Sequence, residues 1–433
     1  MNPASGSKLT GSRAALVFLC FASAYLLSYA LRSVNAVVGP VLMQDLHLSN
    51  TDLGILTAAY FIGFSAMQLP LGVWLDQYGA RRTESCLLAV GVLGCLLFAW
   101  SDSFAGLCLG RTLIGAGVSS CLMGAFKGFR LWYPLGLQSS LASSMMVAGT
   151  AGALASTVPV TLALPLLGWR GLFVLVALLL ALVALALYFG LQKVEQEFNA
   201  ASSSAATLQH PSSARPANSF LHNIAGYGEI FRHPYFRRLG LLGFVNHGIF
   251  IALQTLWAGP WMIKVLGKTP QQSSQILFAF NTCLLLGYLA LAWVAPRYIR
   301  SGRATGWAVE WVVGLGLGAA LLVQVAILAL PFSWAWVLWL LLTLCVAVTA
   351  LIQTHLSLTF PEHLAGRANS AYNLLIFVGA FFAQAGIGWL IDFFAAHQFT
   401  SVAAMRAALA VCVLLQFLSV LRFALHPARP SVA

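Results

Sequence analysis

Gly72-Val73-Trp74-Leu75-Asp76-Gln77-Tyr78-Gly79-Ala80-Arg81-Arg82 is a short charged stretch between two long apolar runs. Its glycines permit a close helix approach and a tight turn. The carboxylate of Asp76 is tolerated at a membrane edge, where it can meet an arginine or a helix N-terminus. The two arginines at the end of the stretch anchor the chain on the cytoplasmic side. The stretch therefore predicts a loop that joins two membrane spans.

The composition is that of a chain that lies mostly in lipid. Of its 433 residues, 60% are hydrophobic and 8% are charged, whereas soluble domains carry about 25% charged residues. The formal net charge of +12 raises nucleic acid as a partner. The basic residues, however, lie mostly in short links between apolar runs, and membrane topology and anionic lipid headgroups explain that better. We therefore expect a lipid bilayer, and no nucleic acid, around this chain.

Apolar runs of about 20 residues, long enough to cross a bilayer, occur twelve times. They lie near 15–42, 51–74, 83–101, 104–127, 139–165, 169–192, 238–263, 271–295, 305–329, 332–358, 367–393 and 402–424. A polar segment rich in Ser, Pro and charge separates the first six from the last six, and it buries too little apolar surface to fold alone. We therefore predict an N-terminal six-helix bundle over 1–192, a linker over 193–236 and a C-terminal six-helix bundle over 237–433.

The distribution of loop charges predicts the orientation of the spans. With the N-terminus in the cytoplasm, most basic loop residues lie inside, and the loops outside hold Arg170, Lys264, Lys268 and Arg406. Cytoplasmic loops carry such an excess of Lys and Arg. The sequence therefore predicts a multi-pass protein of the bacterial inner (plasma) membrane, with the linker and both termini in the cytoplasm.

The opening stretch follows the pattern G-x-x-x-D-x-x-G-x-R-R, which resembles the loop between helices two and three of the major facilitator superfamily. Further matches are Arg111-Thr112-Leu113-Ile114-Gly115, Gly168-Trp169-Arg170 and Gly366-Arg367-Ala368-Asn369. With the span pattern they cover essentially the whole chain. The resemblance implies an all-α membrane fold of twelve transmembrane helices in two pseudo-symmetric six-helix bundles, with a central cavity and alternating access.

A conformational latch is expected at the loop between spans two and three. Asp76 would hold the cytoplasmic ends of the bundles together through the N-terminus of span eleven, near Arg367, and an arginine such as Arg130. The residues assigned to this latch are Gly72, Asp76, Gly79, Arg81, Arg82 and Arg130.

Polar residues that follow one face of a membrane helix are the best indicators of a cavity. Span one carries such a stripe, with residues three and four apart on one helix face: Tyr25, Ser28, Tyr29, Arg32 and Asn35. Stripes on spans four, seven and eleven hold Arg111, Gln254, Trp257, Asn373 and Phe377, and span ten offers Thr349, Gln353 and His355. The residues predicted to contact a substrate are Tyr29, Arg32, Asn35, Arg111, Gln254, Trp257 and Asn373.

Arg32 and Arg111 are the sharpest of these signals. Each lies two to three turns from the outer end of its span, roughly 10–15 Å deep at about 1.5 Å per residue. An arginine within the membrane costs a few kcal/mol unless it meets a partner or water, and no acid lies midway along spans one, four or seven. The pair therefore predicts a bidentate socket for an anion. A structural role for Arg111, bonding backbone carbonyls or side chains of span one, is an equal alternative.

The arginine pair is similar to that of the organic anion:cation symporters of the superfamily. Their pattern also places acids at the positions that are Leu31 and Val118 here, so the expected proton carriers are missing. Coupling to protons would then use His247, His355 or Glu310, or be absent, and another coupling ion is the alternative to protons. For His247, a hydrogen bond within the bundle is the alternative role.

No Walker A loop, HExxH motif or nucleophile elbow occurs in the sequence, and the eight cysteines lie in apolar runs without metal-ligand spacing. We expect no enzyme, no catalytic residue, no cofactor and no metal site. The sequence predicts a monomeric secondary active transporter that imports a small organic anion. One alternative is an exporter of drugs or metabolites, although the exporter signature G-x-x-x-G-P-x-x-G-G is absent from span five. The other is a non-transporting membrane sensor on the same fold.

Overall fold

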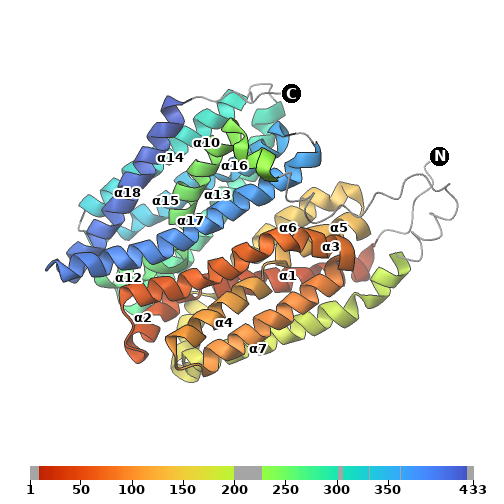
Figure 1. Ribbon diagram of the computed structural model, residues 1–433, viewed down its shortest axis with the longest axis horizontal. Coiled ribbons are helices and arrows are strands. Elements are labelled where there is room, and N and C mark those ends of the chain that lie inside the picture. Colours follow the sequence, from red (N-terminus) through yellow and green to blue (C-terminus); the bar gives the residue numbers. More distant parts are fainter. Residues whose placement is uncertain (1–8, 199–226, 301–305, 331, 361, 427–433) are drawn as a thin grey trace. The chain divides into compact units, whose positions relative to one another are not determined.

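The computed structural model describes residues 9–198, 227–300, 306–330, 332–360 and 362–426, and these fold almost entirely into helices (Figure 1). Ten of the described helices are long and apolar enough to cross a membrane. Two of these, over Asn50–Trp100 and Val158–Phe198, are far longer than one span, and a shorter apolar helix covers Ser140–Ala155. Together they account for the predicted spans. The prediction of an all-α membrane fold is confirmed.

The main α-helices of the first half, as far as the structure describes it, are α1 (Gly11–Ser33), α2 (Asn35–Asp45), α3 (Asn50–Trp100), α4 (Phe104–Gly117), α5 (Cys121–Trp132), α6 (Gln138–Ala155) and α7 (Val158–Gly190). Two of them bend at glycines with left-handed backbone, Gly79 (φ 77°, ψ 170°) in α3 and Gly168 (φ 62°, ψ 173°) in α7. Since side chains with a Cβ rarely adopt such φ values, these glycines mark the points where one span turns into the next.

The second half begins with span seven, which runs through α10 (Pro234–Leu242), η2 (Gly243–His247), α11 (Gly248–Ala252), η3 (Leu253–Trp257) and α12 (Ala258–Lys264). It is followed by α13 (Pro270–Arg300), α14 (Gly306–Ala329), α15 (Trp336–Ala347), α16 (Ala350–Thr359), α17 (Glu362–Ala396) and α18 (Ser401–Leu425). The segments η2 and η3 are π-helical turns. Such turns occur mostly inside α-helices and frequently at functional sites. Span seven is therefore a candidate for part of the functional site.

By their internal packing the residues form two compact units. Unit 1 comprises 1–31, 63–152 and 170–223, and unit 2 comprises 32–62, 153–169 and 224–433. The C-terminal part of span one, the N-terminal part of span two and the C-terminal part of span five therefore pack with the second half of the chain. The predicted bundle boundaries at residues 192 and 237 divide the chain in sequence and differ from the boundaries of these units. The division into two six-helix bundles stays a prediction. Most of the predicted linker, residues 199–226, lies outside the described part of the structure.

Close helix contacts through glycine hold each unit together. In unit 1, a Cβ atom at Gly117 of α4 would lie 2.2 Å from the backbone nitrogen of Gly91 in α3. In unit 2, a Cβ atom at Gly259 of α12 would lie 2.0 Å from the carbonyl oxygen of Ala36 in α2. Lipid tails are as apolar as the side chains, so membrane helices associate by such close packing and by hydrogen bonds. The second contact brings the outer part of span one against span seven.

A carboxylate caps the start of span two within unit 2. Asp392 Oδ2 of α17 accepts hydrogen bonds from the Thr51 backbone nitrogen and Oγ1, both at 2.6 Å, and its Oδ1 accepts one from Asn50 Nδ2 at 2.7 Å. The first N–H groups of a helix have no partner within the helix, and a negative charge is favourable there. The cap therefore joins span two to span eleven.

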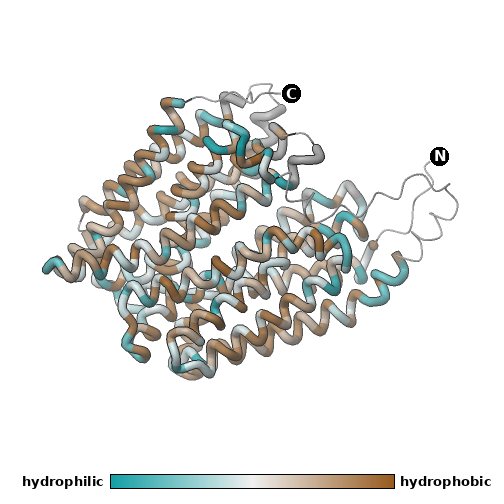
Figure 2. The backbone as a smooth tube through the Cα atoms, viewed as in Figure 1, coloured by the Kyte–Doolittle hydropathy of each residue, from teal (hydrophilic) through white to brown (hydrophobic). Residues whose placement is uncertain are grey.

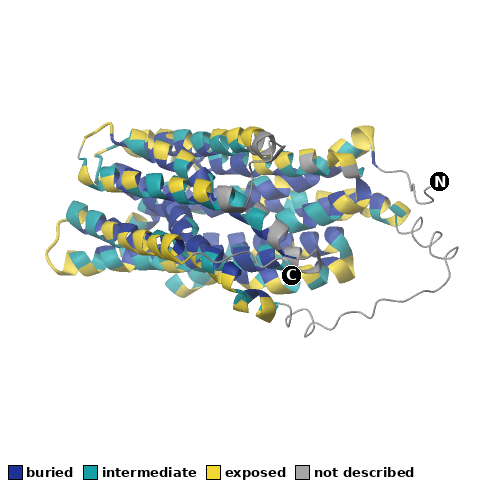
Figure 3. Cartoon of the chain, turned by 90° about the horizontal axis from the view of Figure 1, so that it is seen from above, coloured by how far each residue is buried: buried dark blue, intermediate teal, exposed yellow. Residues whose placement is uncertain are grey.

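The surfaces of the helices are those expected in lipid. Hydrophobic backbone runs along most of each helix, while hydrophilic segments gather at helix ends and loops (Figure 2). Exposed residues lie on outward helix faces and in the loops (Figure 3). They include large apolar side chains such as Leu166 (85% exposed) and Leu322 (73% exposed). A bilayer would cover these side chains.

Candidate functional site

Arg32 is the buried cation of unit 2 on span one. Its side chain is 8% exposed, and its guanidinium carbon lies 5.0 Å from the ring centroid of Phe377 on α17. The ring of Phe377 in turn stacks on Phe61 of α3, with the centroids 6.1 Å apart and the planes at 18°. A cation over an aromatic face gains about 0.5–2 kcal/mol, most where water is excluded. The contact holds the guanidinium against span eleven.

His247 joins span seven to span ten. It lies in the π-helical turn η2, and its Nδ1 pairs with Thr349 Oγ1 at 3.0 Å. A hydrogen bond within the bundle was the alternative role considered for His247, and this bond agrees with it. The role of His247 as a proton carrier stays a prediction.

Spans ten and eleven contribute a pair of amides. Gln353 Nε2 donates to Asn373 Oδ1 at 2.5 Å. Gln353 lies one turn from Thr349 on span ten, and Asn373 lies one turn from Phe377 on span eleven, so each pair shares a helix face. These six residues, Arg32, His247, Thr349, Gln353, Asn373 and Phe377, are called the Arg32 cluster below. The cluster combines a cation, two amides, a hydroxyl and an aromatic face, and none of its members is acidic.

Three other predicted contact residues of unit 2 bond to neighbouring helices. Asn35 is fully buried, and its Nδ2 donates to Thr57 Oγ1 at 2.8 Å. On span seven, Gln254 Nε2 donates to Asn281 Oδ1 at 2.9 Å, and Trp257 Nε1 donates to the carbonyl oxygen of Gln384 at 3.2 Å. These bonds tie helices together and lie outside the Arg32 cluster. Substrate contact by Asn35, Gln254 and Trp257 stays a prediction.

Unit 1 holds the two remaining predicted contact residues. The ring of Tyr29 meets Tyr25 edge-on at 5.0 Å between centroids. Arg111 is completely buried, its Nη1 donates to the carbonyl oxygen of Leu31 at 3.2 Å, and its guanidinium lies 5.9 Å from the ring centroid of Phe98. A bond to a span-one carbonyl is what the structural alternative for Arg111 expects. Its substrate role stays a prediction.

In the predicted latch, Asp76 forms an ion pair within unit 1. Its Oδ1 lies 2.6 Å from Lys127 Nζ, and the Asp76 side chain is 73% exposed. The partner in the described structure is thus Lys127 rather than Arg130, which lies one turn further along α5 and is exposed. Surface ion pairs of this kind contribute about 0–1 kcal/mol to stability, so any effect of Asp76 has to come through conformational change.

Arg81, by contrast, is buried. Its Nε lies 2.5 Å from Glu195 Oε2, its Nη1 donates to the carbonyl oxygen of Tyr188 at 2.9 Å, and its guanidinium lies 4.9 Å from the ring centroid of Tyr188. The side chains of the pair are 6% and 14% exposed. Arg82, the next residue, is exposed. Arg81 therefore fastens the loop to the end of span six. The sequence predicted that Arg81 and Arg82 both lie at the membrane surface. It did not indicate Glu195 as the partner of Arg81.

A second polar network lies at the end of unit 2 that carries Arg237, Arg238 and Arg422, called its basic end below. Glu310 of α14 accepts a hydrogen bond from Tyr235 Oη at 3.0 Å and pairs with Arg238 Nη1 at 2.7 Å. His355 Nε2 lies 2.5 Å from Tyr235 Oη. Two of the proton carriers considered from the sequence, Glu310 and His355, are therefore bridged by Tyr235. Sequence reasoning missed Tyr235, because a tyrosine near a helix end is usually a membrane-interface residue.

Comparison with known proteins agrees with the helices and the loop motif. The model of the Major Facilitator Superfamily matches residues 21–384. The hexuronate transporter of Escherichia coli (strain K12) is 24% identical over 271 residues, covering 61% of this chain and 62% of that protein. The galacturonate transporter of Dickeya chrysanthemi is 24% identical over 274 residues, covering 61% of this chain and 78% of that protein. The chain thus spans about 62% of the length of the hexuronate transporter that it matches.

Solved structures resemble the chain over almost its whole length. A bacterial homolog to the human lysosomal transporter Spinster, in an inward-facing and unoccupied conformation, aligns with a TM-score of 0.75 at 17% identity and covers 96% of this chain and 97% of its own. A D-xylose-proton symporter aligns with a TM-score of 0.67 at 15% identity, covering 94% and 98%. At these identities the likeness concerns the fold. With a family model that covers most of its residues, the chain belongs to the Major Facilitator Superfamily.

Proposed function

We propose that the protein is a secondary active transporter that imports a small organic anion of the sugar-acid class by alternating access. The observation that carries the proposal is the buried guanidinium of Arg32, held over the ring of Phe377. The names of the matched relatives, a hexuronate and a galacturonate transporter, support the substrate class. A hexuronate offers one carboxylate and several hydroxyl groups, and these are the groups that the Arg32 cluster can bind.

Each member of the Arg32 cluster has a chemical role in this proposal. The planar fork of Arg32 binds the carboxylate through two N–H groups. The amides of Gln353 and Asn373 both donate and accept hydrogen bonds, which suits sugar hydroxyls. The face of Phe377 covers the C–H side of the ring. Tyr29, Asn35, Gln254 and Trp257, together with Arg111, are kept as further proposed contacts from the sequence.

Proton coupling is a separate part of the proposal. His247 is the proposed carrier, because its imidazole forms a hydrogen bond between spans seven and ten, with Thr349. The network of Glu310, Tyr235 and His355 is the other candidate, although Arg238 already pairs with its carboxylate. Uptake into proteoliposomes with and without an inward proton gradient decides whether protons are coupled, and His247→Gln and Glu310→Gln decide through which group.

The test of the central proposal is uptake of radiolabelled galacturonate and of neutral galactose by proteoliposomes. Wild type should take up the acid and discriminate against the sugar. Arg32→Gln should lose most of this uptake, whereas Arg232→Gln, which removes an exposed charge from a short helix outside the cluster, should retain it. Uptake of the neutral sugar at the same rate, or full uptake of the acid by Arg32→Gln, would refute the proposal. Efflux without uptake would favour an exporter.

We further propose that the protein works as a monomer in the bacterial inner membrane. The basic loops favour cytoplasmic termini. Molecular mass in detergent by light scattering checks the oligomeric state, and a stable dimer would contradict it.

A further inference from the structure

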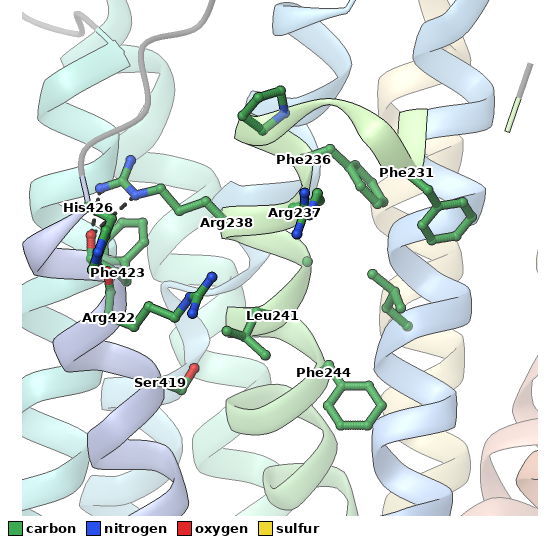
Figure 4. Close-up of a pocket in the computed structure, with 13 residues that line it drawn as sticks. Phe231, Phe236, Arg237, Arg238, Leu241, Phe244, Ser419, Arg422, Phe423 and His426 are labelled. Atoms are coloured by element: carbon green, nitrogen blue, oxygen red, sulfur yellow. Dashed lines mark hydrogen bonds between the residues drawn. The ribbon is translucent and has the colours of Figure 1, made fainter. Parts of the chain in front are cut away.

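A groove opens on the outer side of unit 2 at its basic end. It has a volume of about 790 Å³ and lies between α10, α17 and α18 (Figure 4). None of the residues assigned to the proposed substrate site lines it. The groove is therefore a separate feature of the surface.

The floor of the groove is apolar. It is formed by Leu241 and Phe244 of span seven and by Leu375 of α17. Leu241 is 37% exposed, and Leu418 and Leu421 on α18 are 50% and 39% exposed. The helices around the groove, over Pro234–Lys264, Arg367–Ala396 and Ser401–Leu425, are long and apolar enough to cross a membrane, so an acyl chain suits its floor.

The rim of the groove is basic. Arg237 of α10 and Arg422 in the last turn of α18 both line it and are exposed, with His426 beside them. Arg422 reaches from α18 toward α10 in Figure 4. No acidic partner is found for Arg237 or Arg422 within the described ranges of the chain.

The third arginine of the groove has a different role. Arg238 pairs with Glu310, and its Nε and Nη2 donate to the carbonyl oxygen of Phe423 at 3.2 and 2.8 Å. Its guanidinium also lies 4.1 Å from the ring centroid of Phe423. Arg238 therefore fixes α10 to α18 and shapes the groove, and the charge directed at a ligand comes from Arg237 and Arg422.

We propose that this groove binds one anionic phospholipid of the surrounding membrane. Arg237 and Arg422 would bind the phosphate diester, and an acyl chain would lie along Leu241, Phe244 and Leu375. Basic pockets between membrane helices suit such headgroups, and each arginine near the surface contributes about 1 kcal/mol. The apolar floor favours a lipid over a soluble phosphate, because a soluble phosphate has no acyl chain to bury there. The proposal does not depend on the transported substrate.

The experiment is native mass spectrometry of the purified full chain with added phosphatidylglycerol, phosphatidylcholine or glycerol 1-phosphate. Wild type should bind phosphatidylglycerol in preference to phosphatidylcholine. Arg237→Gln and Arg422→Gln should each weaken this binding about fivefold, and the double variant about 25-fold. Arg232→Gln is the matched control, because it removes one exposed charge near the groove without lining it. Leu241→Trp should weaken binding by filling the floor, with no change of charge.

Three outcomes would overturn the proposal. Arg232→Gln could weaken binding as much as Arg237→Gln, which would indicate diffuse attraction to the basic end. The double variant could bind phosphatidylglycerol like wild type. Glycerol 1-phosphate could bind as tightly as the lipid and be insensitive to Leu241→Trp, which would make the groove a soluble-anion site. Thermal unfolding of each variant checks that it is folded.

Discussion

The guanidinium of Arg32 on span one lies over the ring of Phe377 on span eleven, 5.0 Å from its centroid. Both residues belong to unit 2, because the C-terminal part of span one packs with the second half of the chain. This contact joins span one to span eleven within unit 2. A helix stripe in the sequence shows which residues share a face, whereas the contact shows what that face meets.

Binding of a sugar acid should depend on the fork of Arg32 and on its contact with Phe377. Arg32→Gln should weaken binding roughly tenfold to a hundredfold, since a charge-assisted hydrogen bond contributes about 1.5–3 kcal/mol. Arg32→Lys should be impaired as well, because lysine lacks the planar fork. Phe377→Leu should cost about two- to fivefold. Isothermal titration measures these affinities. If Phe377→Leu weakens binding equally in the wild-type and Arg32→Gln backgrounds, the two residues act independently and the cluster is wrongly defined.

Asp76 should affect transport more than stability. Its ion pair with Lys127 is exposed, so Asp76→Asn should change the free energy of unfolding by less than about 1 kcal/mol. The latch hypothesis expects slower transport with substrate binding largely intact. Lys127→Gln should reproduce this defect, and Arg130→Gln should not. An unchanged transport rate for Asp76→Asn would make it an ordinary loop residue.

The buried ion pair of Arg81 and Glu195 should stabilise unit 1. Removing one partner leaves the other charge buried, which costs about 3–5 kcal/mol. Arg81→Gln and Glu195→Gln should therefore each lower the midpoint of thermal unfolding, and the double variant should recover part of the loss. Arg82→Gln, the exposed neighbour, serves as the control and should stay within about 0.5 kcal/mol of wild type. An Arg81→Gln midpoint equal to that of Arg82→Gln would contradict the importance of the pair.

Gly168 should be intolerant of alanine for a backbone reason alone. A Cβ atom there meets nothing within 4 Å, but φ is +62° and ψ is 173°, a backbone region that is essentially limited to glycine and that costs other residues about 1–3 kcal/mol. Gly190, also in α7 and also with nothing within 4 Å of an added Cβ, has no left-handed φ. Gly190→Ala should be neutral or stabilising by up to about 1 kcal/mol. Equal unfolding midpoints for the two alanine variants would show that the bend relaxes without cost.

The orientation in the membrane can be tested at Ser203, in the predicted linker and outside the described residues. In a background without the eight native cysteines, Ser203→Cys should resist an impermeant thiol reagent applied to intact cells and react after permeabilisation. Arg170→Cys, in a loop predicted to lie outside, provides the opposite control. Labelling of Ser203→Cys in intact cells would reverse the assignment.

Much of the fold could be predicted because a membrane imposes a simple length and polarity on each span. Twelve apolar runs and the charged loop with its glycines were sufficient to predict the helices. Partners were harder to predict. The sequence suggested an arginine for Asp76, and the described partner is Lys127 one turn earlier. Glu195 lies far from Arg81 in the chain, and no local pattern connects residues that meet only when two spans pack together.

The sequence by itself determined the membrane class, the spans and the helix faces, because hydrophobic length and helical periodicity are local properties of the chain. Tertiary structure decided which polar groups meet. Arg32 contacts the ring of Phe377, whereas Arg81 and Arg238 form ion pairs with Glu195 and Glu310. The physical reason is that a buried polar group has to find its partner inside the protein. That partner is chosen by the packing of helices distant in sequence, through the close approach of glycines such as Gly117 and Gly259.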